Sequence, residues 1–147
     1  ARQYHQAALD ALPEAAMAQR ALVYTHLAET LLAGAEIDLA AEAIAAAQQS
    51  VEVVRDVPLH VHIDIVAAQV ALARGDTQRA EQRLQAASTQ MTHTFDRRLQ
   101  VWYGVARSQL AALQGDGEQA LALWREADKL RRTLQMPEIS TDWLAQT

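Results

Sequence analysis

The sequence predicts an all-α fold in which antiparallel helix pairs repeat along the chain. Half of the 147 residues are hydrophobic but only 5% are aromatic, and there are 5 glycines and 3 prolines, which is typical of packed, alanine-rich helices. A turn followed by alanine, a large apolar residue and a second alanine occurs three times, at an interval of about 40 residues. The repeated positions are Ala40, Ile44 and Ala47, then Ala80, Leu84 and Ala87, then Ala120, Trp124 and Ala127. This spacing places them on one stripe of a helix, with small side chains where a neighbouring backbone comes close.

The first predicted helices lie on either side of Pro13. Residues 1–12 place apolar side chains at helical spacing before this proline. Pro13 suits the first turn of the next helix, where its missing N–H costs no hydrogen bond, so a helix is predicted over residues 13–33. Its partner is predicted over residues 36–55, because Pro58 follows shortly afterwards.

The next four helices are marked by turn and cap residues. Gly75 ends one helix, and Asp76 is the predicted N-cap of its partner. Asp116 and Gln119 have the spacing of a capping box at the start of the last partner helix. These helices are predicted over residues 59–74, 76–92, 95–114 and 116–134.

In two short segments a β-strand is the alternative to a helix. They are the β-branched run 51–54 and the alternating run 60–65, and both lie inside longer patterns of helical period, which favours helices. Beyond a turn at Pro137, residues 142–144 look like the start of another helix. With half repeats at both ends and no initiator methionine, residues 1–147 are expected to be a single repeat domain from a longer protein.

Composition and motifs exclude several classes of function. No apolar run approaches the roughly 18 residues of a membrane span, no signal peptide is recognisable and cysteine is absent, so a cytoplasmic location is expected. A net charge of −5 argues against direct nucleic-acid contact by this segment. No phosphate-binding loop, nucleophile elbow or zinc-protease motif occurs, so neither an enzyme nor a cofactor is predicted. His60 and His62 would point in different directions on a helix, and no metal site is expected.

The best copy of the repeat resembles the tetratricopeptide repeat. Its signature positions are Tyr24, Leu27, Ala28, Leu31, Ala40, Ile44 and Ala47. The first helices of the later copies depart from that signature, and the period of about 40 residues exceeds the standard length of about 34. The chain therefore looks like a divergent, long-helix member of the class. This resemblance implies a right-handed solenoid in which the first helix of each pair lines a concave face.

The resemblance also nominates residues of the concave groove. They are Leu22, Thr25, Glu29, His62, Ile65, Gln69, Trp102, Val105 and Gln109, and His26 is expected next to them. The repeat offset aligns Leu22 with His62 and Trp102, while the glutamate and the two glutamines form a second, hydrogen-bonding row. Such a surface suits an extended peptide, a partner helix or a neutral polar ligand such as a sugar, and Trp102 is the favoured anchor. The alternative is that these are ordinary surface and packing positions.

Other conspicuous residues have structural interpretations. Trp124 occupies the large-residue position of a second helix and is expected in the core. The basic run 129–132 lies near a predicted helix C-terminus, where positive charge complements the helix dipole. Trp143 could cover the apolar end of the stack or be exposed.

The predicted function is binding of a partner or an effector. The alanine- and leucine-rich texture is similar to the helical-repeat sensor arms of maltose-activator-like, LuxR-type, ATP-dependent bacterial transcriptional regulators. That resemblance implies an effector or partner protein in the groove, with ATP and DNA bound by other domains. The alternative is a general protein-interaction scaffold without a small-molecule effector. Because a repeat buries its apolar side only against a neighbour, end-to-end self-association or a loose first and last helix is also predicted.

Overall fold

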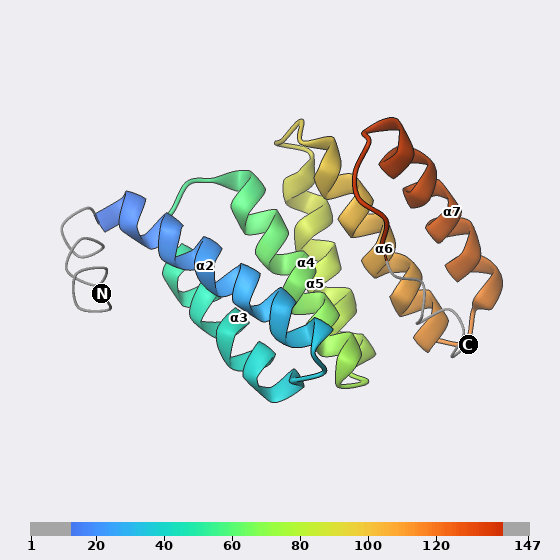
Figure 1. Cartoon of the computed structure of the whole chain (residues 1–147), viewed down its shortest axis with the longest axis horizontal. Helices are drawn as coiled ribbons and strands as arrows, with labels where there is room; N and C mark the ends of the chain where they lie inside the picture. Colours follow the sequence, from blue (N-terminus) through green and yellow to red (C-terminus); the bar gives the residue numbers. More distant parts are fainter. Residues whose placement is uncertain (1–12, 140–147) are drawn as a thin grey trace.

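The computed structural model of the chain describes residues 13–139, which form three antiparallel helix pairs connected by short turns (Figure 1). The helices are α2 Pro13–Ala33, α3 Ile37–Val51, α4 Val57–Ala73, α5 Thr77–Met91, α6 Arg97–Leu113 and α7 Gly117–Thr133. No strand occurs in this part of the chain, so the predicted all-α class is confirmed there and the strand alternative is wrong for both runs. The helices expected before residue 13 and at residues 142–144 lie outside the described residues. None of the described helices is both long and apolar enough to cross a bilayer.

The turn within each helix pair has the same construction in all three pairs. Gly75 and Gly115 adopt φ angles of 74° and 83°, and Ala35 occupies the equivalent place with a φ of 60°. The amide of the following residue donates to a carbonyl five residues earlier, as in a Schellman motif; Asp76 N bonds Ala71 O at 2.9 Å. This geometry reverses the chain and sets the two helices of a pair against each other.

Aspartates cap four of the helices. The side chains of Asp56, Asp76, Asp96 and Asp116 accept hydrogen bonds from backbone amides in the first turns of α4, α5, α6 and α7. The predicted cap at Asp76 is therefore confirmed. At Asp116 one bond of the predicted capping box forms, from Gln119 N at 3.0 Å. The Asp116 amide donates instead to Ala111 O at 2.9 Å, because it takes part in the preceding turn.

One predicted boundary is wrong by several residues. α3 ends at Val51, whereas the sequence pattern extends to residue 55. Val54 lies in the connection after α3, where its side chain is buried in the core and its amide donates to Val51 O at 2.9 Å. Burial of Val54 and the cap at Asp56 therefore end the helix earlier than local propensity indicates.

Within residues 13–139 most of the core belongs to two apolar clusters, and α4 contributes to both. One cluster joins α2, α3 and α4, and the other joins α4, α5 and α6. The small side chains of Ala40, Ala80 and Ala120 are all buried, as the repeat predicts. In the large-residue position Ile44 and Leu84 are buried, but Trp124 is only partly buried.

The three pairs pack side by side in chain order, from blue to red in Figure 1. We call α2, α4 and α6 the first helices and α3, α5 and α7 the second helices. Each first helix packs on its own partner, and neighbouring first helices also contact one another. The second helix of one pair contacts the first helix of the next. Consequently, side chains about 40 residues apart on the first helices lie close together on one face.

Candidate functional site

The first helices bring together an aromatic and acidic cluster, here called the His–Trp row. It consists of His26, Glu29, His62 and Trp102. The ring of His62 on α4 stacks on Trp102 of α6, with centroids 5.0 Å apart and an interplanar angle of 20°. The ring of His26 on α2 meets His62 edge to face, with centroids 6.0 Å apart and an angle of 70°. All three first helices thus contribute a ring to one continuous arrangement.

Glu29 holds the two histidines of the row in place. Its Oε1 atom lies 3.1 Å from Nε2 of His62 and 3.5 Å from Nδ1 of His26. The His62 side chain is only 13% exposed, whereas Glu29 and His26 are 43% and 63% exposed. A neutral His62 can satisfy this contact with its Nε2–H, and a protonated His62 makes it an ion pair. Glu29 therefore fixes the orientation of the ring that lies against Trp102.

A pair of amides extends this face along the helices. Gln69 on α4 donates from Nε2 to Oε1 of Gln109 on α6, at 3.4 Å. The two residues are 40 positions apart, so the contact joins equivalent places in successive pairs. Each amide keeps further donor or acceptor capacity, because an amide side chain has two N–H groups and an oxygen with two lone pairs. The face therefore combines aromatic surface with hydrogen-bonding groups.

Asp96 lies at the start of α6, the helix that carries Trp102. It is the N-cap of α6, and its carboxylate accepts hydrogen bonds from the backbone and guanidinium of Arg98. The hydrogen bond from the Arg98 side chain is the largest cause of a lowered pKa for this carboxyl, and the charge of His62 is a smaller contribution in the same direction.

The remaining nominated residues have different positions. Thr25, Ile65 and Val105 are buried, so they support the face from below instead of lining it. The hydroxyl of Thr25 donates to Ala21 O at 2.7 Å. Leu22 is exposed, and the α2 ring that meets His62 is that of His26. The repeat offset predicts that Leu22 lies beside His62 and Trp102. In the structure His26 occupies that place instead of Leu22.

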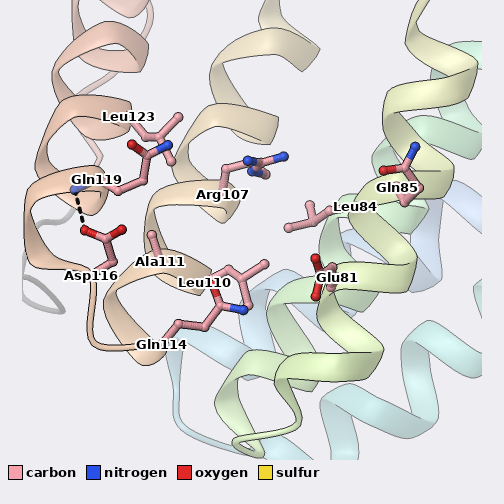
Figure 2. A pocket seen from close by; sticks show the side chains of 10 residues that line it. All are labelled: Glu81, Leu84, Gln85, Arg107, Leu110, Ala111, Gln114, Asp116, Gln119 and Leu123. Carbon is pink, nitrogen blue, oxygen red and sulfur yellow. Dashed lines mark hydrogen bonds between the residues drawn. The ribbon is translucent and has the colours of Figure 1, made fainter.

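The second helices border a different kind of site, which the sequence did not reveal. One hollow lies between α3 and α5 over α4, and another lies between α5 and α7 over α6. Figure 2 shows the latter, with Glu81 and Leu84 of α5 on one side, Leu123 of α7 on the other and Arg107 of α6 between them. The two hollows have equivalent linings, for example Ile44, Ala71 and Asp76 in one and Leu84, Ala111 and Asp116 in the other. The repeat itself therefore produces them.

No metal site is visible in residues 13–139, where no group of three histidine, cysteine, aspartate or glutamate side chains has a suitable arrangement. His60 and His62, which are close in sequence, have different surroundings. Nε2 of His60 lies 2.7 Å from Val54 O, in the connection after α3, whereas His62 faces Glu29.

Comparison with known proteins gives no match: no protein-family model fits the sequence, and no curated protein or solved structure matches it. Function is therefore inferred from the arrangement of the side chains.

Proposed function

We propose that the chain is a binding module whose first-helix face, centred on the His–Trp row, receives an effector or partner. The helix pairs would form a right-handed, tetratricopeptide-like solenoid with this face on its concave side. The contacts between successive first helices and the equivalent hollows between second helices support a regular repeat of this kind.

The stacked rings of His62 and Trp102 are the observation that carries the proposal. Trp102 is partly exposed, and His62 is held on it by Glu29 at 3.1 Å. Stacking restricts both rings before a ligand arrives, so less conformational entropy is lost when one binds. A preorganised aromatic platform of this kind is common where a protein anchors a ligand or partner.

The surrounding polar groups indicate the class of ligand. Glu29 accepts hydrogen bonds, and Gln69 and Gln109 can both donate and accept them. Neither these groups nor the His–Trp row includes a lysine or an arginine, so an acidic tail would lack the strong cations that usually hold it. A neutral polyhydroxylated molecule such as a sugar, or an extended peptide that offers backbone N–H and C=O groups, satisfies both the aromatic and the polar groups.

The wider role that we propose is that of an effector-sensing or interaction domain in a larger bacterial transcriptional regulator. The alanine-rich helix pairs and the polar, aromatic first-helix face support this role. ATP and DNA would be bound by other domains of such a regulator. The alternative is an adaptor that holds partner proteins without a small-molecule effector, and it shares the same face.

A calorimetric screen against sugars, small metabolites and extended peptides tests the proposal. We expect a saturable ligand whose dissociation constant rises at least tenfold, about 1.4 kcal/mol, in Trp102→Ala and His62→Ala. Trp124→Phe is the matched control, because Trp124 lies on α7, outside this face, and the affinity should not change. A sugar or metabolite hit favours the sensor, whereas binding of peptides alone favours the adaptor. Binding that is unaffected by the Trp102 and His62 substitutions contradicts the proposed site.

A further inference from the structure

The two hollows between second helices differ in charge although their backbones are equivalent. Ala67 lines the hollow over α4, and Arg107 occupies the same place in the hollow over α6 (Figure 2). Arg107 is exposed, while Ala67 is buried. The hollow over α4 has cations at other places, Arg74 and Arg79, whose equivalents over α6 are Gln114 and Gln119, so the cation of the later hollow lies at a different position, on the first helix.

A second difference between the two helix pairs is an ion pair that is present in one and absent from the other. In the α4–α5 pair, Asp64 and Arg83 connect the two helices with an ion pair of 3.6 Å. The equivalent residues of the α6–α7 pair are Gly104 and Leu123, which cannot form such a pair. A Cβ atom on Gly104 would lie 3.0 Å from Cβ of Ala127, so glycine allows a close approach of α6 and α7 here. The ion pair of the second pair therefore has no counterpart at this position of α6 and α7.

A cavity of about 640 Å³ lies at this place. Arg107 and Leu123 line both this cavity and the hollow of Figure 2, so the two are adjacent. We call it the α6–α7 cavity. Its volume is within the range of roughly 300–1,000 Å³ that is usual for small-molecule sites.

The lining of the α6–α7 cavity combines apolar surface with positive charge. The apolar part comes from Tyr103, Leu123, Ala127 and Leu130, and the charged part from Arg97, Arg107, Lys129 and Glu126. Three cations thus face one carboxylate, in a chain whose net charge is −5. Within residues 13–139 none of these cations takes part in an ion pair.

Arg107 is oriented by the aromatic residue of the same cavity. Its Nη1 donates to the hydroxyl of Tyr103 at 3.3 Å, and its guanidinium carbon lies 5.9 Å from the centre of that ring. This contact uses one of the five N–H groups of the guanidinium. The others can donate to an anion beside the apolar surface, and hydrogen bonds between ionised groups are the stronger kind.

We propose that the α6–α7 cavity binds a small organic carboxylate with an apolar, ring-sized body. The body lies against Tyr103, Leu123 and Leu130, and the carboxylate is held by Arg107 and Lys129. This site is separate from the His–Trp row, and it does not depend on the function proposed for that row.

Titration with 2-naphthoate, followed by amide chemical shifts, tests the site, and 2-naphthamide serves as the uncharged probe of the same shape. We expect saturable shift changes at Gly104, Leu123 and Ala127, and at least tenfold weaker binding of the amide. Arg107→Gln and Lys129→Gln should each weaken binding of the naphthoate about fivefold and leave that of the amide unchanged. Leu123→Glu, which places a negative charge on the apolar surface, should abolish both.

Controls separate this site from other apolar surfaces. Arg79→Gln removes a cation from the equivalent hollow over α4, and Trp102→Ala alters the His–Trp row; neither should change binding of the naphthoate. The amide spectrum of each variant shows whether it remains folded. Equal affinity for the two probes, shift changes centred elsewhere, or unchanged affinity in both folded Gln variants would overturn the proposal.

Discussion

At the scale of single residues, Asp64 is a carboxylate in an unfavourable environment. Burial raises the pKa of this carboxyl above its ordinary value of 3.8, and it outweighs the opposing effects of Arg83 and His60. The side chain of Asp64 is only 13% exposed. Its ionised form is therefore less well solvated in the folded protein than in the unfolded chain.

We predict that Asp64→Asn gains stability relative to the parent protein as the pH rises. Because the folded state binds the Asp64 proton more tightly than the unfolded state does, the stability of the parent falls between pH 3.8 and the raised pKa. Asparagine does not titrate, so the difference in unfolding free energy should move in favour of the variant across this window. Urea denaturation at pH values from about 3 to 6 measures it.

Asp96→Asn serves as a control, because we expect the opposite pH dependence of its unfolding free energy relative to the parent. The pKa of Asp96 is lowered, chiefly by the hydrogen bond from Arg98, so its stabilising contribution is present above pH 3.8 and is lost as the pH falls through the lowered pKa. Asparagine also serves as an N-cap, so the cap itself is retained. The unfolding free energy of Asp96→Asn should therefore fall relative to that of the parent as the pH rises. A difference for Asp64→Asn that moves against the variant as the pH rises would show that burial does not raise the pKa of Asp64.

The contacts of the candidate site were only partly predictable. The repeat offset brings His62 to Trp102 and Gln69 to Gln109, because each pair is 40 residues apart on successive first helices. It does not predict that Glu29 reaches a histidine of the next pair, since that contact depends on side-chain rotamers. Thr25 was nominated for the groove but is buried, because helical spacing gives a direction and not the distance to the neighbouring helix.

At the scale of elements, the turn between α2 and α3 differs from its two counterparts. Ala35 has a φ of 60° where glycine occupies the other two turns. Glu36, the N-cap of α3, makes no side-chain cap hydrogen bond, whereas Asp76 and Asp116 do. The first pair therefore lacks two local stabilising features that the other pairs share.

We predict that Ala35→Gly and Glu36→Asp each stabilise the protein. Glycine removes the strain of a left-handed alanine, about 1–2 kcal/mol, offset in part by the greater entropy of the unfolded chain, so a net gain of about 0.5–1 kcal/mol is expected. An aspartate cap should add about 1 kcal/mol. Chemical denaturation measures both effects. Gly115→Ala, the reverse change in the third pair, should cost about 1 kcal/mol, and a destabilising Ala35→Gly would contradict this explanation.

The order of the helices and most of their ends were predictable because the signals for them are local. Proline, glycine at positive φ and aspartate caps act within one turn of the chain. The early end of α3 was not predictable, because it depends on burial of Val54 in a core built by three helices. The α6–α7 cavity was missed for the same reason, since Gly104 and Leu123 form it only when the two helices meet.

At the scale of the whole molecule, as far as residues 13–139 describe it, one side of α2 carries exposed apolar side chains. Val23 is 65% exposed, and Leu27 is also exposed. Their equivalents in the second pair, Ile63 and Ala67, are 1% and 8% exposed, because they pack against the preceding pair. In the second pair this side of the first helix is therefore a packing surface, whereas the equivalents in the third pair, Tyr103 and Arg107, are partly buried and exposed.

We predict that the protein self-associates through this side of α2 in a concentration-dependent manner. Val23→Glu and Leu27→Glu should each raise the dissociation constant at least tenfold, because each places a charge at an apolar interface. Sedimentation velocity over a range of concentrations measures it. Val53→Glu is the matched control: Val53 is 66% exposed, but its equivalent in the second pair, His93, is exposed too, so this position is not a packing surface of the repeat. A protein that stays monomeric at all concentrations, or that responds equally to Val53→Glu, would show that α2 does not use this surface to bind another copy.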